Sequence, residues 1–155
     1  MENDWNLALY APQDLYQLAV ILESRGIDFY GRLISISLEN GVKQELLFLQ
    51  GEEEQHKAFF EKLVGPAARP ASLLNDLAGQ LLGREVLYPL EKLFDEMKVS
   101  QQQEALRFGV KMEQLTIAFY LQLKKVSAPS MTEDLDFIVS QEEKHKQKLT
   151  IILAH

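Results

Sequence analysis

The chain has 155 residues, of which 46% are hydrophobic and 25% are charged, and this balance is typical of one globular domain that would span residues 1–155. Its formal net charge of −7 argues against nucleic acid and anionic membranes as partners, because both carry negative charge. The absence of cysteine excludes disulfide bonds, thiolate metal sites and thiol catalysis.

The chain begins with an acidic segment, Met1-Glu2-Asn3-Asp4, which lacks the hydrophobic region of a signal peptide. No apolar run in the sequence approaches the ~20 residues that a membrane-spanning helix needs. We therefore expect a cytoplasmic protein without a membrane span.

Two long helices are predicted in the first half of the chain. Apolar residues recur at helical spacing over residues 13–39 and predict a helix there. Asn40-Gly41 predicts a helix stop followed by a tight turn. The same spacing resumes over residues 42–64, and a Gly-Pro pair ends this second helix. Residues 12–64 are therefore expected to form a helical hairpin.

A long connection is expected over residues 65–99. A structureless loop of that length is uncommon in a compact domain. Apolar residues at helical spacing over residues 86–97 predict one short amphipathic helix within it. The connection would act as a crossover between two hairpins.

The second hairpin is predicted over residues 100–154. Helical spacing indicates one helix over residues 100–126 and another over residues 131–153. Ser130 and Glu133 resemble a capping box at the start of the last helix. No strand pattern is present, so the sequence predicts an all-α fold.

The two hairpins share one sequence pattern, which indicates an internal repeat. Residues 14–33 and 104–123 are identical at six of twenty positions, with an offset of 90. Residues 46–64 and 135–153 are identical at six of nineteen positions, with an offset of 89. The chain is therefore interpreted as two copies of one helical hairpin.

Each copy carries a Glu-x-x-His step in its second helix. Glu53 and His56 lie three residues apart, as do Glu142 and His145, so each carboxylate shares a helix face with an imidazole. Apolar residues occupy the same face, where an unpaired glutamate or histidine would be costly to bury. Metal binding is the leading explanation for this pattern.

A glutamate in the first helix of each hairpin, Glu23 or Glu113, completes the set. Along the sequence, the midpoint between Glu23 and Glu53 falls next to the turn predicted between the first two helices. The midpoint between Glu113 and Glu142 likewise falls next to the break between the last two helices. In an antiparallel hairpin such residues lie at the same height. Four carboxylates and two imidazoles would then meet in the core of a four-helix bundle, which is the ligand set of di-metal carboxylate bundles.

A tyrosine follows each of these glutamates by seven residues: Tyr30 follows Glu23, and Tyr120 follows Glu113. Seven residues span roughly 10 Å of helix, and helical side chains lean towards the N-terminus. We expect each hydroxyl to donate a hydrogen bond to a ligand carboxylate across the bundle and so to support the site.

These motifs resemble those of the ferritin-like superfamily, and specifically of its rubrerythrin-like branch, over residues 12–154. The resemblance implies a ferritin-like four-helix bundle, an erythrin domain without a rubredoxin tail, that holds two iron ions, with zinc or manganese as possible substitutes. Glu53 and Glu142 would bridge the two ions, and each ion would also take the first-helix glutamate and the histidine of one hairpin. The implied metal ligands are Glu23, Glu53, His56, Glu113, Glu142 and His145, with Tyr30 and Tyr120 in support.

The resemblance implies a di-iron oxidoreductase that reduces hydrogen peroxide or O₂ in defence against oxidative stress. Because the chain lacks a cysteine-rich rubredoxin tail, its electrons would come from a separate donor such as a rubredoxin-like protein. The family pattern also suggests a homodimer. Typical rubrerythrins carry a second glutamate one turn after the third-helix ligand, where this chain has Thr116, so the ligand set departs from that of the family's peroxidases.

Two alternatives stay open. Ferritin-type iron storage or detoxification would use the same ligands within a cage of many chains. A non-catalytic metal-binding or interaction protein would hold zinc or no metal at all. Core packing is the competing interpretation for the two tyrosines, and Glu52, Glu54 and Glu143 are interpreted as solvated neighbours.

Overall fold

The computed structural model describes residues 5–37, 39–83 and 102–155. Every regular element within these ranges is a helix, which confirms the all-α class for the described part of the chain. The α-helices are α1 (Pro12–Ile36), α2 (Asn40–Val64), α3 (Ala71–Leu82), α6 (Gln102–Val126) and α7 (Thr132–Leu153). The 3-10 helices are η1 (Leu7–Leu9), η2 (Gly65–Ala67) and η3 (Pro129–Met131).

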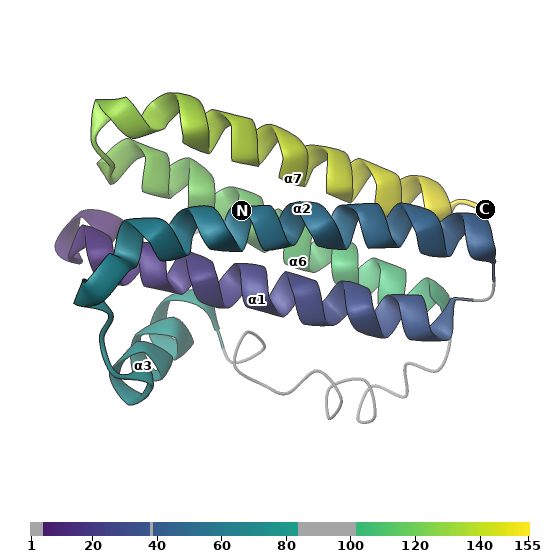
Figure 1. Cartoon of the computed structure of the whole chain (residues 1–155), viewed down its shortest axis with the longest axis horizontal. Helices are drawn as coiled ribbons and strands as arrows, with labels where there is room; N and C mark the ends of the chain where they lie inside the picture. The colour runs from purple at the N-terminus through teal and green to yellow at the C-terminus, as the bar shows by residue number, and fades with distance from the viewer. Residues whose placement is uncertain (1–4, 38, 84–101) are drawn as a thin grey trace.

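The four long helices form a bundle of two hairpins (Figure 1). α1 packs along α2, and α6 packs along α7, each pair joined by a short connection. The hairpins lie side by side, so that α1 contacts α6 and α2 contacts α7. Among the described residues, no helix combines the length and the apolar character needed to cross a membrane.

The turn predicted at Asn40-Gly41 is wrong, because both residues belong to the first turn of α2. α1 ends at Ile36, and Ser37 takes an extended backbone conformation (φ −79°, ψ 137°). The Ser37 hydroxyl donates a 2.8 Å hydrogen bond to the Leu33 carbonyl, which satisfies an acceptor at the end of the helix. Asn40 is instead the first residue of α2, and Gly41 does not have a positive φ.

The capping box predicted at Ser130 and Glu133 is also wrong. Ser130 lies inside the 3-10 turn η3, so Met131 is the residue that precedes α7, and no side chain caps that helix. Glu133 and Asp134 lie in the first turn of α7. Their negative charges are favourable there because of the helix dipole.

α3 lies in the connection of residues 65–99, where the sequence predicts a helix only over residues 86–97. Leu74, Ala78 and Leu82 recur every four residues and are buried, and α3 contacts α1. This helix is therefore held by an apolar face. Residues 86–97 lie outside the described part of the chain, so the helix predicted there stays a prediction.

The core of the bundle consists of two apolar layers with a polar layer between them. One layer contains Leu22 of α1, Phe60 of α2 and Phe119 of α6. The other contains Phe29 of α1 and Leu46 of α2. Burying each such side chain contributes about 1.5–3 kcal/mol, so the apolar layers hold the four helices in register around the polar layer.

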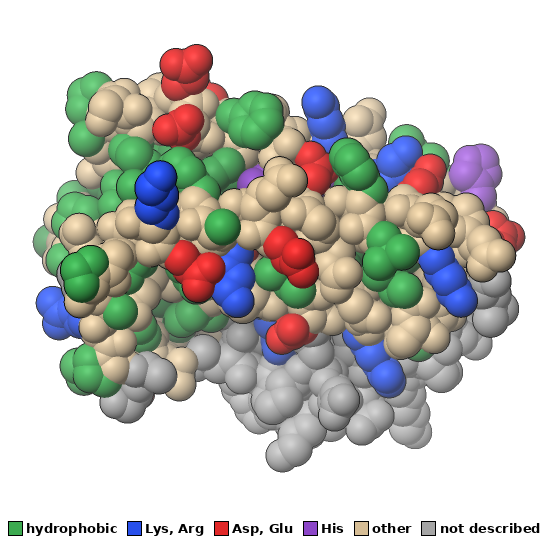
Figure 2. Space-filling model, in the orientation of Figure 1, with side chains coloured by type: hydrophobic (Ala, Val, Ile, Leu, Met, Phe, Trp, Pro, Cys, Tyr) green, Lys and Arg blue, Asp and Glu red, His purple; other side chains and the backbone are tan. Residues whose placement is uncertain are grey.

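α1 and α6 approach each other closely at Gly109. A Cβ atom at this position would overlap the ring of Phe29, so glycine is the residue that lets the ring pack against the α6 backbone. On the face of the molecule shown in Figure 2, acidic and basic side chains are interspersed over the described helices.

Candidate metal centre

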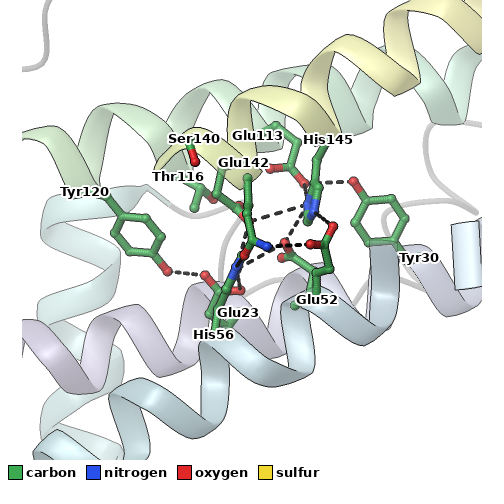
Figure 3. Close-up of polar contacts among 12 residues, drawn as sticks. Glu23, Tyr30, Glu52, His56, Glu113, Thr116, Tyr120, Ser140, Glu142 and His145 are labelled. Atoms are coloured by element: carbon green, nitrogen blue, oxygen red, sulfur yellow. Dashed lines mark hydrogen bonds and ion pairs between the residues drawn. The ribbon is translucent and has the colours of Figure 1, made fainter. Parts of the chain in front are cut away.

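The polar layer of the bundle is built from the six predicted ligands. Each long helix contributes to this layer, and five of the six side chains are labelled in Figure 3, where they point towards one another: Glu23, His56, Glu113, Glu142 and His145. Glu53 lies with them, because its carboxylate belongs to the same clusters of ligand atoms. All six are at most 5% exposed. They are Glu23 from α1, Glu53 and His56 from α2, Glu113 from α6, and Glu142 and His145 from α7.

These side chains form two overlapping groups that could each hold a metal ion. Within each group, the four ligand atoms lie within 4.8 Å of one another. Glu53 and Glu142 belong to both groups, as a pair of bridging ligands would. The first group is Glu23, Glu53, His56 and Glu142, and the second is Glu53, Glu113, Glu142 and His145.

The atoms that face the centre of the site are not satisfied by hydrogen bonds. His56 Nδ1 lies 3.0 Å from Glu142 Oε1, and His145 Nδ1 lies 2.9 Å from Glu53 Oε1. None of these four atoms has a hydrogen-bond partner among the described residues. Unpaired buried polar atoms are costly, and a bound cation would satisfy all four.

The charges of the site interact strongly when no metal is bound. Burial, with the negative charges of Glu23 and Glu113, raises the pKa of Glu53 well above 4.5. Burial lowers the pKa of His56, but its contacts with Glu142 and Glu23 outweigh this effect and raise the value from 6.5 to about 10. In the metal-free site, protons on Glu53 and His56 thus supply the positive charge that bound metal ions would otherwise supply.

The corresponding residues of the second hairpin behave in the same way. Burial, followed by the charges of Glu113 and Glu53, raises the pKa of Glu142 well above 4.5. Burial lowers the pKa of His145, but contacts with Glu113 and Glu142 outweigh it and bring the value to about 9. The metal-free site therefore retains protons that metal ions would displace.

Both hydrogen bonds predicted for the tyrosines are present, and both cross the bundle. The Tyr30 hydroxyl of α1 donates a 2.9 Å bond to Glu113 Oε1 of α6, and the Tyr120 hydroxyl of α6 donates a hydrogen bond to Glu23 Oε2 of α1. The second oxygen of each carboxylate, Glu113 Oε2 and Glu23 Oε1, has no hydrogen-bond partner among the described residues. Each tyrosine therefore fixes one oxygen of a glutamate and leaves the other for a cation.

The far side of each imidazole is held by a residue that the sequence interpretation does not place in the site. His56 Nε2 lies 2.5 Å from Gln141 Oε1, and His145 Nε2 lies 3.1 Å from Glu52 Oε1. Gln141 Nε2 donates a 2.5 Å bond to Glu52 Oε2. One hydrogen-bonded chain thus joins the two histidines.

These hydrogen bonds determine which histidine nitrogens face the centre. The carboxylate of Glu52 only accepts hydrogen bonds, so the amide nitrogen of Gln141 must face it and the amide oxygen must face His56. The Nε2 atoms of both histidines then carry protons, and in the neutral rings both Nδ1 lone pairs point at the carboxylates. Metal-binding histidines are held in this way by an acceptor on the opposite ring nitrogen.

The interpretation of Glu52 as a solvated residue is wrong. Its side chain is only 17% exposed, because the opposite hairpin covers it. The helix period carried a signal, since Glu52 precedes His56 by four residues and Gln141 precedes His145 by four. Glu54 and Glu143 are exposed, as predicted.

Two further positions shape the centre. Thr116 is buried, and its hydroxyl donates a 3.0 Å bond to the Met112 carbonyl, so it contributes no carboxylate. Its counterpart in the repeat is Gly26, where a Cβ atom would overlap Glu53 Oε2. The absence of a side chain at Gly26 therefore provides the space that the Glu53 carboxylate occupies.

Comparison with known proteins supports the fold. No family model matches the chain, and no curated protein matches it at a significant level. A solved structure of a hypothetical protein from Pyrococcus furiosus is similar to it, with a TM-score of 0.68 and 20% sequence identity over 99% of this chain and 95% of that chain. At this identity the likeness shows a shared fold alone, and it extends over almost the full length of both chains.

Proposed function

We propose that the chain is a rubrerythrin-like member of the ferritin-like bundles, that its buried centre holds two iron ions, and that it reduces hydrogen peroxide or O₂ with electrons from a separate donor. The observation that carries this proposal is the pair of overlapping ligand groups that share Glu53 and Glu142. Carboxylate and imidazole ligands without thiolates suit ferrous iron and manganese, and also zinc.

The charges of the donor set support two divalent ions rather than one. The four glutamates contribute a charge of −4, and two divalent ions would contribute +4. The four glutamates and the two ions together would therefore be neutral. A single divalent ion would leave two of these negative charges to be balanced by protons, because unbalanced charge is costly in the core. Glu23 and His56 would hold one ion, and Glu113 and His145 the other.

When bound, the two ions supply one electron each, which matches the balanced reaction H₂O₂ + 2 e⁻ + 2 H⁺ → 2 H₂O. The chain itself fixes the geometry of the ligands. Tyr30 and Tyr120 hold one oxygen of Glu113 and Glu23, respectively, and their pKa values are raised well above 10 by burial and the nearby glutamates. They therefore remain protonated donors at neutral pH.

The apolar layers on either side of the centre keep bulk water away from it. Leu22 and Phe60 lie on one side, and Phe29 and Leu46 on the other, all at most 2% exposed. In such surroundings electrostatic interactions are stronger than in water. The site is thus suited to a small oxidant such as peroxide or O₂ rather than to a large polar substrate.

A single-turnover reaction tests this function. The iron-loaded, reduced protein is mixed with peroxide under nitrogen, and the oxidation of iron is followed by absorption. We expect one peroxide to be consumed per chain, faster than by the same concentration of free ferrous iron. Oxidation no faster than free iron would refute the proposal, and uptake of many irons per chain by a particle of cage mass would indicate storage.

A further inference from the structure

The six candidate ligands of the metal centre form two equivalent sets. The repeat pairs Glu53 with Glu142 and His56 with His145 at an offset of 89. The tyrosine bonds are matched as well, because each tyrosine donates to the first-helix glutamate of the other hairpin. These contacts therefore give neither metal position an advantage.

Among the described residues, two of the equivalent pairs that differ lie directly beside the ligands. One pair is Gly26 and Thr116, but the Thr116 hydroxyl is neutral and bonded to the backbone of its own helix. The other pair is Glu52 and Gln141, which are related by the same offset, 52 + 89 = 141. This pair differs by a full charge and lies directly behind the histidines.

Each member of the pair backs the histidine of the opposite hairpin. The carboxylate of Glu52 accepts from Nε2 of His145, whereas the amide oxygen of Gln141 accepts from Nε2 of His56. A carboxylate attracts the Nε2 proton more strongly than an amide does, so it makes the opposite nitrogen a better donor to a metal. Its negative charge also contacts His145 directly, whereas it is linked to His56 only through Gln141.

From this asymmetry we infer that the two metal positions are unequal, and that the position of Glu113 and His145 binds a divalent cation more tightly than the position of Glu23 and His56. Glu52 is the positioning residue that produces the difference. The inference rests on the proposed two-metal centre but not on its reaction. Removing the partner behind a metal-binding histidine typically costs about 10- to 100-fold in affinity, so we expect a difference of at least about tenfold between the two positions.

Titration with Co²⁺ tests the inference without redox chemistry. Binding is followed by calorimetry and by the visible absorption of the ion. We expect two steps in the parent protein, the first at least about tenfold tighter than the second. Glu113→Ala should remove the tight step, and the matched variant Glu23→Ala should remove the weak one. Two equal steps in the parent, or loss of the tight step in Glu23→Ala, would overturn the inference.

A charge-preserving exchange separates the role of Glu52 from a general effect on folding. The double variant Glu52→Gln/Gln141→Glu keeps the composition of the site and moves the carboxylate behind His56. The preference should then reverse, so that Glu23→Ala removes the tight step in this background. An unchanged preference would contradict the inference. If the exchange does not fold, Glu52→Gln alone should weaken the tight step about tenfold and bring the two steps together, whereas unaltered steps would overturn the inference.

The outcome is distinguishable from that of the proposed function. Unequal Co²⁺ steps in a protein that does not react with peroxide would support the inference and refute the oxidoreductase. Equal steps in a protein that does react would do the reverse.

Discussion

The Tyr30 hydroxyl of α1 donates a 2.9 Å hydrogen bond to Glu113 of α6, 83 residues further along the chain. Tyr120 of α6 returns the same kind of bond to Glu23 of α1. Each hairpin therefore orients a candidate metal ligand of the other, and each candidate ligand group combines residues of both hairpins.

Replacing either tyrosine by phenylalanine should weaken the metal-free fold. The ring volume is kept, but Tyr30→Phe leaves Glu113 Oε1 buried without its donor, which costs about 1–3 kcal/mol. Urea unfolding of the metal-free protein measures this loss. Tyr10→Phe, at a half-buried ring outside the site, is the control and should stay close to the parent. Equal losses of stability in Tyr30→Phe and in the control Tyr10→Phe would show that the bond to Glu113 contributes nothing.

The space at Gly26 leads to a second prediction. At an ordinary helical position, Gly→Ala stabilises by up to about 1 kcal/mol. Gly26→Ala should instead displace the carboxylate of Glu53, because the new Cβ atom would overlap it, and should therefore reduce the amount of metal bound per chain. The matched control is Gly51→Ala in α2, where a Cβ atom meets nothing within 4 Å. Full metal binding by Gly26→Ala would contradict the proposed position of Glu53.

The stability of the metal-free protein should decrease as pH rises. The pKa values of His56 and His145 are raised from 6.5 to about 10 and about 9. The folded state thus binds these protons more tightly than the unfolded state does, and the resulting stability is fully present below about pH 6.5 and lost as pH rises through 9 and 10. The raised pKa values of Glu53 and Glu142 act in the same direction.

Urea midpoints of the metal-free protein between pH 6 and pH 10 test this dependence. The double variant His56→Gln/His145→Gln should show a smaller decrease over the same range, because it lacks the two imidazoles. A midpoint that rises with pH in the parent protein would contradict the charge balance described for the site. Metal binding should show the opposite trend and tighten as pH rises, since the ions displace protons.

The six residues of the centre could be predicted from the sequence because they depend on regular features. Helical period places Glu53 and His56 on one face, and the repeat extends the same geometry to Glu142 and His145. The antiparallel hairpin then brings Glu23 level with Glu53. None of these steps requires knowledge of how loops fold, so the structure brings together the residues that the pattern selects.

The residues that support the centre depend instead on contacts between the two hairpins. Glu52 could not be distinguished from its exposed neighbour Glu54 by composition, and its role became visible only where α7 placed Gln141 and His145 against it. The sequence also did not predict the helix start at Asn40. The preceding helix ends at a hydrogen bond from the Ser37 hydroxyl to the backbone, and the Asn-Gly pair, which favours a turn, lies in the next helix instead. Local propensity was overridden there by the neighbouring structure.

Iron content per chain tests the central claim most directly. The metal-free protein is loaded with ferrous iron under nitrogen and desalted, and bound iron is counted. We predict about two irons per chain for the parent and for the control Glu54→Ala, whose side chain is exposed. Glu53→Ala and Glu142→Ala should each lose most of the iron, because both ions share these carboxylates. A parent that binds no iron, or a Glu53→Ala variant that binds as much as the parent, would contradict the account.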